Sequence, residues 1–102
     1  MKARVRWSPL AIQRAAEAAR HIAEKDTAAA YRWAEGLFDA VKPLGRFPLR
    51  GRIVPEVHRA EIRELIYHSH RVVYRFSPGQ VEILTVRHAR RRLDLAELEA
   101  DE

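Results

Sequence analysis

The chain of 102 residues contains no cysteine, so disulfide bonds and thiolate metal sites are excluded. Its four glycines are scattered and do not form a phosphate-binding loop. The spacing of His58, His68, His70 and His88 matches no common zinc motif. We therefore expect neither a metal nor another cofactor.

Long apolar segments are also missing. No apolar run approaches the roughly 20 residues that a membrane-spanning helix needs. The N-terminal stretch lacks the apolar core of a signal peptide. We therefore predict a soluble, cytoplasmic protein without a membrane partner.

The charges of the chain are unbalanced. Lysine and arginine number 19 against 14 acidic residues, which gives a net charge of +5. This excess predicts an anionic partner, either nucleic acid or an acidic protein segment, although basicity can also serve solubility alone. A length of 102 residues predicts a single domain, spanning residues 1–102.

The second half of the chain has the pattern of three consecutive strands. Residues 62–67, 71–76 and 81–86 are rich in β-branched and aromatic residues and alternate in polarity. The segment 77–80 has proline second and glycine third, which predicts a type II turn. Residues 68–70 supply another short connection. The sequence therefore predicts a three-stranded antiparallel meander.

Alternation along these strands predicts which face of the sheet each side chain occupies. Arg71 is expected on the face opposite Tyr74 and Phe76. In the last strand, one face is expected to carry Val81, Ile83 and Thr85, and the other Glu82, Leu84 and Val86.

The first half of the chain predicts a strand over residues 2–7, followed by a helical hairpin. Ser8 and Pro9 have the residue types of a helix start, an N-cap followed by proline at the first helical position. Asp26 caps a second amphipathic helix, which Pro43 should end. The economical arrangement is two antiparallel helices joined by a short turn.

Two further segments complete the predicted fold. Residues 44–56 contain prolines and glycines and are expected to form a structured loop. Leu93, Leu95 and Leu98 could form a short C-terminal helix that contacts a partner, or a frayed terminus. The predicted class is α+β: an N-terminal strand, a helical hairpin and a three-stranded antiparallel meander, with the first strand beside the last.

Several short motifs occur along the chain in a fixed order: Trp7-Ser8-Pro9, Phe47-Pro48, Gly51-Arg52, Val54-Pro55-Glu56, Arg63-Glu64, His70 to Arg75, and Val81 to His88. Together with the order of elements, they resemble the RelE/ParE superfamily of toxins from bacterial type II toxin–antitoxin modules. The resemblance runs from Arg4 to about Arg91. It implies the same fold and a cognate antitoxin, joined to the toxin in a hetero-oligomer.

The superfamily divides by target. RelE-like members cleave mRNA on the ribosome, whereas ParE-like members bind and poison DNA gyrase without nuclease activity. Residues 51–56 and 82–91 look more like ParE-like sequences. The resemblance therefore implies a plasmid-stabilisation toxin that inhibits growth by binding gyrase. The alternatives are a ribosome-dependent mRNA endoribonuclease, or an inactive relative that only binds its antitoxin.

The ribonuclease alternative has three candidate catalytic residues in the absence of a metal. Arg71 matches a phosphate-binding arginine of ribonuclease members, and a guanidinium can hold two phosphate oxygens at once. His88 lies where several of those members place an acid, and Glu56 could serve as a base. The alternative interpretations are that Arg71 is solvated or pairs with the antitoxin, that His88 is structural, and that Glu56 pairs with an arginine.

Seven arginines are predicted to bind nucleic acid or a protein target: Arg52, Arg63, Arg71, Arg75, Arg87, Arg90 and Arg91. Arg71 and the basic terminal stretch are expected to be exposed. Arg46 and Arg50 add charge to the middle loop and could hold an RNA backbone. Glu64 is expected to form a salt bridge with its neighbour Arg63.

Overall fold

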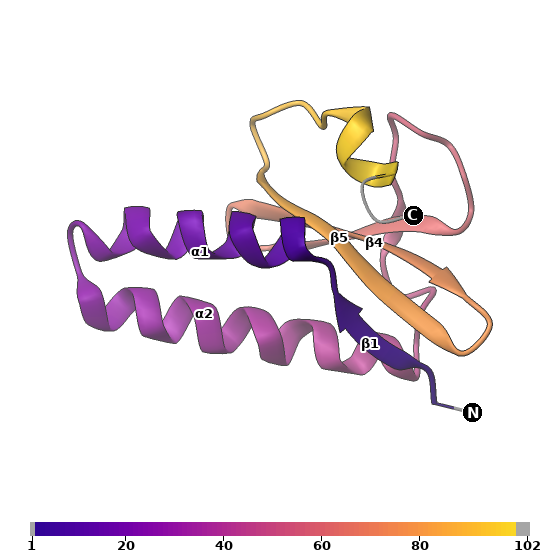
Figure 1. The fold of residues 1–102 in the computed structure, drawn as a ribbon, viewed down its shortest axis with the longest axis horizontal. Coiled ribbons are helices and arrows are strands. Elements are labelled where there is room, and N and C mark those ends of the chain that lie inside the picture. Colours follow the sequence, from indigo (N-terminus) through magenta and orange to yellow (C-terminus); the bar gives the residue numbers. More distant parts are fainter. Residues whose placement is uncertain (1, 100–102) are drawn as a thin grey trace.

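A computed structural model describes residues 2–99 of the chain. Two helices lie side by side on one face of a five-stranded sheet with strand order β1-β5-β4-β3-β2 (Figure 1). A short C-terminal 3₁₀ helix lies on the opposite face. The strands and helices have these bounds: β1 Arg4–Trp7, α1 Pro9–Ala23, α2 Thr27–Val41, η1 Lys42–Gly45, β2 Arg52–Ile53, β3 Ile62–Tyr67, β4 His70–Ser77, β5 Gln80–His88 and η2 Leu95–Glu99.

The helical hairpin begins at the predicted caps. The Ser8 hydroxyl accepts a hydrogen bond from the backbone N–H of Ala11 at 3.0 Å, and Pro9 opens α1. An Asp26 carboxylate oxygen accepts from the N–H of Ala29 at 3.0 Å and starts α2. Both side chains satisfy helix N–H groups that lack an intrahelical partner. The chain leaves α2 at Pro43 through η1, as predicted.

The strand pairings confirm the predicted meander. β3, β4 and β5 pair antiparallel in sequence, and β1 lies parallel to β5. Gly79 has φ of +79° in the tight turn between β4 and β5, a conformation that glycine adopts without strain. The middle loop contains one element that the sequence did not predict, the two-residue edge strand β2 beside β3.

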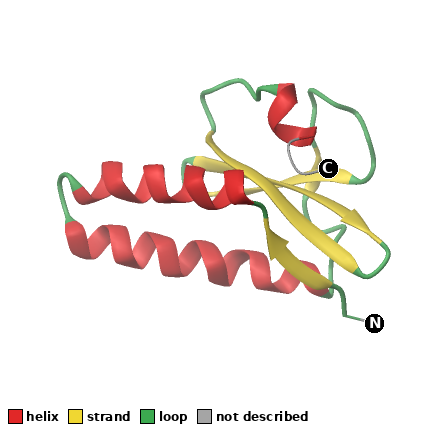
Figure 2. Ribbon diagram, in the orientation of Figure 1, coloured by secondary structure: helices red, strands yellow, loops and turns green. Residues whose placement is uncertain are grey.

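Each face of the sheet has its own apolar core. The larger core lies between the sheet and the helices and includes Leu37, Val72 and Tyr74, which are fully buried or nearly so. The smaller core lies on the opposite face and joins Val73 and Leu84 to Leu93 and Leu98. Figure 2 shows the segment that follows β5 on the side of the sheet away from the helical hairpin. The central strands are therefore covered on both sides, which explains their nearly continuous burial.

A β-bulge in β5 overturns the predicted alternation in the second half of that strand. Val73 pairs with Thr85, but the next residue of β4, Tyr74, pairs with Ile83, so Leu84 is an extra residue. Leu84 contacts Val73 in the smaller core, and Thr85 also lies on that face. Val86 therefore joins the helix-side core instead of the face on which Leu84 lies.

The C-terminal segment packs against the sheet of its own chain. Leu93 and Leu98 are buried in the smaller core, whereas Leu95 is exposed. The buried Glu97 carboxylate accepts hydrogen bonds from the Thr85 hydroxyl at 2.7 Å and from Arg14 of α1 at 2.8 Å. The predicted C-terminal helix is thus one short 3₁₀ turn. No helix within residues 2–99 is long and apolar enough to cross a membrane.

Candidate functional site

Arg71 lies at the centre of a group of paired charges on the face opposite the helices. We call Arg52, Glu56, Glu64 and Arg71 the Arg71 cluster. β2, β3 and β4 each supply one member, and Glu56 comes from the turn after β2. Arg52 lies directly opposite Glu64 in the β2–β3 pairing. The sheet register therefore brings these charges together.

Each of the three guanidinium nitrogens of Arg71 is hydrogen-bonded to a carboxylate. Its two terminal nitrogens each donate to a different oxygen of Glu56 at 2.8 Å, and its Nε donates to Glu64 at 2.6 Å. Arg52 donates to the second oxygen of Glu64, also at 2.6 Å. Arg71 is 7% exposed, so the prediction that it is exposed was wrong. The reason is this bidentate pairing, which removes the charge from solvent.

The electrostatics of the Arg71–Glu56 pair favour the ionised form of both groups. Hydrogen bonds from Arg71 lower the pKa of Glu56 to about 2, against the opposing effect of burial. The same pairing raises the pKa of Arg71 still further above its usual range. Two arginines and two glutamates leave the cluster close to neutral. Glu56 is therefore a weak base at neutral pH, and pairing with an arginine was the alternative foreseen for it.

His88 does not lie beside Arg71. The bulge in β5 places its ring toward the helices, 5.4 Å from the ring of His70, which in turn lies 5.2 Å from that of Trp33. The Nδ1 atom of His88 accepts from the N–H of Arg90 at 3.1 Å. The structure thus brings Glu56 and Arg71 together and separates His88 from both across the sheet.

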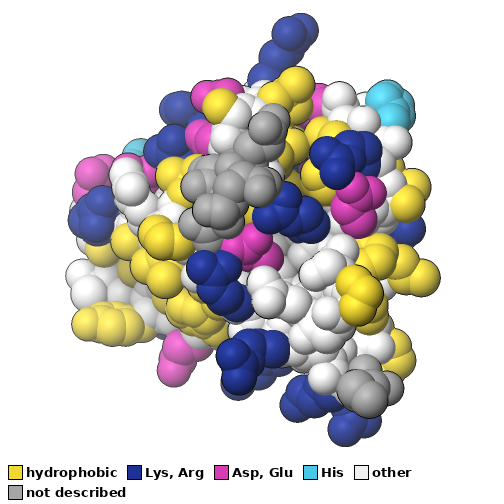
Figure 3. All heavy atoms as spheres, turned by 45° about the vertical axis from the view of Figure 1, so that its right-hand side comes forward, with side chains coloured by type: hydrophobic (Ala, Val, Ile, Leu, Met, Phe, Trp, Pro, Cys, Tyr) yellow, Lys and Arg dark blue, Asp and Glu magenta, His cyan; other side chains and the backbone are white. Residues whose placement is uncertain are grey.

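Most of the other predicted arginines are also paired within the chain. Arg87 donates to Glu97 at 3.1 Å, and Arg75 donates to Glu82 at 3.0 Å. Figure 3 shows one face of the molecule, over which basic side chains are spread with acidic ones among them. Arg90 and Arg91 are exposed, and their guanidinium groups form no ion pair with the described side chains of residues 2–98.

Arg63 has a role that the sequence did not reveal. It forms no salt bridge with Glu64, because adjacent residues of a strand point to opposite faces. Its guanidinium instead donates to the backbone carbonyls of Ala60 and Gly51, at 2.9 and 3.1 Å, and lies over the ring of Phe76. Arg63 therefore holds the backbone of the middle loop.

The middle loop also contains two exposed arginines, Arg46 and Arg50, for which the sequence predicted only that their charge could hold an RNA backbone. Each precedes or follows an exposed apolar side chain, Phe47 or Leu49. The apolar residues between the two arginines, within a loop expected to be ordered, were the signal that could have marked this segment as an interaction surface. Neither guanidinium forms an ion pair with a described residue.

Comparison with protein families gives one match over most of the chain. The model of the family described as "ParE toxin of type II toxin-antitoxin system, parDE" matches residues 5–93. Comparison with curated proteins found no match.

Solved structures with the same fold include three from bacteria. The chain is 17% identical to one in the chromosomal ParDE toxin–antitoxin system of P. aeruginosa, with a TM-score of 0.73, covering 85% of this chain and 96% of that one. It is 25% identical to a chain of the toxin–antitoxin complex RelBE2 of Mycobacterium tuberculosis, with a TM-score of 0.55 and coverages of 86% and 99%. The chain is 16% identical to a chain of the YoeB dimer of Staphylococcus aureus, with a TM-score of 0.55, covering 86% of this chain and 98% of that one.

Proposed function

The chain belongs to the ParE toxin family of type II toxin–antitoxin systems, and we propose that it arrests bacterial growth by binding DNA gyrase, without cutting RNA. We further propose that a cognate antitoxin binds it in a hetero-oligomer and neutralises it. Two of the structurally similar chains come from toxin–antitoxin systems, ParDE and RelBE2, which supports an antitoxin partner here.

The observation that carries the choice of target is the occupied state of Arg71. An RNA phosphate could reach its guanidinium only by displacing Glu56, which holds both terminal nitrogens. A carboxylate with a pKa of about 2 is poorly matched to accepting a proton at neutral pH. With His88 on the other face, the three candidate groups do not surround one reacting phosphate. This arrangement supports a binding toxin over a ribonuclease.

The predicted arginines then divide into two roles. Arg90 and Arg91, exposed and without ion-pair partners among the side chains of residues 2–98, are proposed to contact the target directly. The other five are proposed to shape the surface from within the chain: Arg52, Arg63, Arg71, Arg75 and Arg87. Exposed arginines without partners lose no internal ion pair when they bind an anionic or polar surface.

The test is induced expression in bacteria without antitoxin, scored for growth, the SOS response and mRNA integrity. Gyrase poisoning predicts arrest with filamentation, SOS induction and intact mRNA. Arg90→Ala/Arg91→Ala should weaken the arrest, while Lys25→Ala/Arg32→Ala, which removes two exposed charges from the helical hairpin, one in its turn and one on α2, should not. In a supercoiling assay with purified gyrase, the original chain and Lys25→Ala/Arg32→Ala should inhibit equally, and Arg90→Ala/Arg91→Ala should inhibit less.

Two other outcomes have clear meanings. Rapid, translation-dependent mRNA cleavage that His88→Ala abolishes would overturn the gyrase proposal in favour of the endoribonuclease. An absence of arrest at confirmed expression would leave an inactive relative that only binds antitoxin.

A further inference from the structure

The segment Arg46 to Arg50, which we call the RFPLR loop, displays apolar side chains at the surface. Phe47 and Leu49 are each 60% exposed, and Pro48 lies between them. Large apolar side chains exposed side by side, flanked by charges, are typical of interaction surfaces. None of the functions assigned above to the Arg71 cluster, Arg90 or Arg91 uses this loop.

Buried groups of the sheet hold the loop backbone in place. The Tyr74 hydroxyl donates to the carbonyl of Pro48 at 2.6 Å and accepts from the N–H of Gly51 at 2.9 Å. Arg63 donates to the carbonyl of Gly51 from the same side. A Cβ atom at Gly51 would lie 2.6 Å from the carbonyl oxygen of Glu64, so the close approach requires glycine. The loop is thus rigidly anchored while its side chains point outward.

The surface around the loop is hollowed in two places that share Pro48. One hollow, of about 570 Å³, is lined by the loop itself. The other, of about 390 Å³, is lined mainly by small and apolar residues of η1, the start of the chain and the β4–β5 hairpin, among them Phe76 at the end of β4 and Pro78 in the turn. Together they offer places for apolar side chains of an extended segment.

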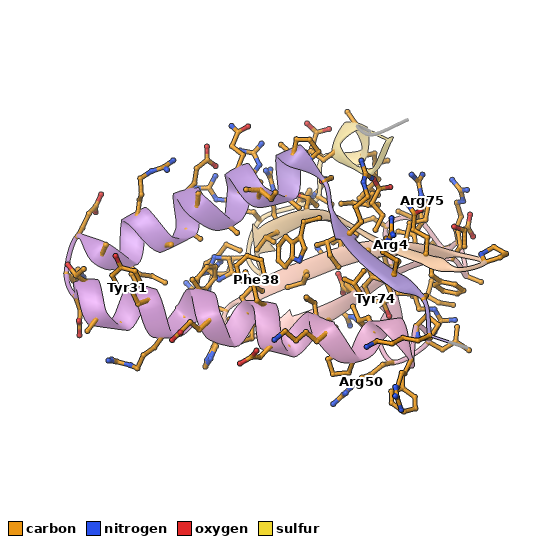
Figure 4. All side chains as sticks on the ribbon, turned by 60° about the horizontal axis from the view of Figure 1, so that its bottom comes forward. Arg4, Tyr31, Phe38, Arg50, Tyr74 and Arg75 are labelled. Atoms are coloured by element: carbon orange, nitrogen blue, oxygen red, sulfur yellow. The ribbon has the colours of Figure 1, made fainter. Side chains whose placement is uncertain are left out.

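The charge at this surface is positive and uncompensated. Arg46 and Arg50 form no ion pair with any described residue, and the nearby Lys42 is neutralised by Asp39 at 3.2 Å. Figure 4 shows Arg50 extending outward near the end of α2, whereas Tyr74 points into the protein. An acidic partner would therefore complete the charges of the surface.

The geometry points to the RFPLR loop as a docking site for an acidic segment of the cognate antitoxin, carrying apolar anchors for the two hollows. This inference rests on the antitoxin partner proposed above. Exposed apolar side chains and apolar hollows favour a peptide over nucleic acid, because a nucleic-acid backbone would use the arginines but not Leu49. A rigid surface also binds at a lower ordering cost, which suits a stable neutralising complex.

The position of the surface separates it from the proposed target contacts. The hollow at Phe76 and Pro78 adjoins the first residue of β5, while Arg90 and Arg91 follow its last residue. A strand of 9 residues extends about 26 Å from its first to its last residue at roughly 3.3 Å per residue. Changes in the loop should therefore weaken antitoxin binding without directly altering the contacts with gyrase.

The first test replaces the apolar side chains. Phe47→Ser/Leu49→Ser should raise the Kd for full-length cognate antitoxin at least ~10-fold in calorimetry, because two anchors are lost. Ile12→Ser/Tyr31→Ser, which removes two exposed apolar side chains from the helical hairpin, should leave the Kd unchanged within about twofold. Growth arrest without antitoxin should be the same for both variants and the original chain.

The second test replaces the charges. Arg46→Ala/Arg50→Ala should weaken antitoxin binding about 3- to 10-fold at low salt and reduce its dependence on salt, relative to Lys25→Ala/Arg32→Ala. Retention on heparin measures binding to a nucleic-acid-like polyanion. The proposal would be wrong if Arg46→Ala/Arg50→Ala reduced retention on heparin while Phe47→Ser/Leu49→Ser left the Kd for antitoxin unaltered. That result would indicate that the surface binds nucleic acid.

Two outcomes distinguish this inference from the proposed function. If both loop variants bound antitoxin normally but no longer arrested growth, the loop would contact the target, and the docking proposal would fail while the toxin assignment stood. If the original chain did not bind its antitoxin at all, the proposed partner itself would be wrong.

Discussion

The Arg71 cluster and the RFPLR loop use the same residue type in opposite ways. Arg71 is buried and neutralised by two carboxylates, whereas Arg46 and Arg50 are exposed and have no ion-pair partner within residues 2–99. The resemblance to ribonuclease members makes Arg71 the first candidate site residue, because it matches a phosphate-binding arginine of those proteins. The structure shows that its charge is already used internally. The number of arginines therefore says less about binding than the number left unpaired.

The two regions are also connected through the sheet. Glu64 accepts hydrogen bonds from Arg52 and Arg71, and its backbone carbonyl lies against Gly51 at the end of the loop. Arg63, the residue before it, holds the loop from the opposite face. We infer that the charges of the Arg71 cluster keep β2 and β3 in register and so help to fix the surface that the loop displays.

The largest effect is expected from Glu64→Gln, which breaks the Arg71 cluster. The Glu64 carboxylate is fully buried and serves two arginines, so neutralising it leaves positive charge without compensation inside the protein. We expect the free energy of unfolding, measured in urea, to fall by about 3 kcal/mol. Glu61→Gln is the matched control, because the ion pair of Glu61 with Arg59 is exposed. Equal stabilities for the two variants would contradict the structural role of the cluster.

The second-largest effect is expected from Tyr74→Phe, which tests how the RFPLR loop is anchored. Tyr74→Phe removes a hydroxyl that the buried N–H of Gly51 and the carbonyl of Pro48 both use. We expect a loss of about 2 kcal/mol in the free energy of unfolding, since both groups lose their partner. Hydrogen exchange of the Gly51 amide should accelerate more than that of amides in α1. Tyr31→Phe, an exposed tyrosine on α2, should change neither quantity.

Much of the fold could be predicted from the sequence because the signals are local. The caps at Ser8 and Asp26, the end of α2 before Pro43 and the turn at Gly79 all follow from the chemistry of one to four residues. The position of β1 beside β5 followed from the connectivity of the predicted elements. The family resemblance agreed with this reading, and the match to residues 5–93 confirms it.

The candidate site could not be predicted to the same degree, because it depends on contacts between distant residues. One extra residue at Leu84 moves His88 to the face opposite Arg71, and alternation alone gives no signal of a bulge. The sequence predicted that Glu56 could pair with an arginine, but it did not identify Arg71 as the partner. The burial of Glu64 between two arginines requires the register of three strands, which no local pattern contains.

A smaller, pH-dependent effect is expected for Glu56→Gln. Because Arg71 lowers the pKa of Glu56 to about 2 from 4.5, the ionised form stabilises the folded state at all pH values above about 4.5. That contribution is lost as the pH falls from 4.5 toward 2, where the carboxylate becomes protonated. At pH 7 we expect the variant to lose about 1 kcal/mol, a modest value because the side chain is partly exposed. The free energies of unfolding of the two proteins, measured in urea and plotted against pH, should converge below about pH 3. A difference that stayed constant with pH would show that the Arg71–Glu56 pairing does not cause the loss of stability.

The smallest effect on stability is expected for the two arginines of the RFPLR loop. Arg46→Ala/Arg50→Ala should change the free energy of unfolding by less than about 0.5 kcal/mol, because neither guanidinium has an internal partner to lose. Arg71→Ala, in contrast, should destabilise the protein strongly by leaving Glu56 and Glu64 without their shared cation. If urea unfolding showed similar losses for both, the unpaired arginines would also be structural. If it separates them as expected, a loss of binding in the loop variant can be attributed to the surface itself, whereas a loss of toxicity in Arg71→Ala reports first on folding.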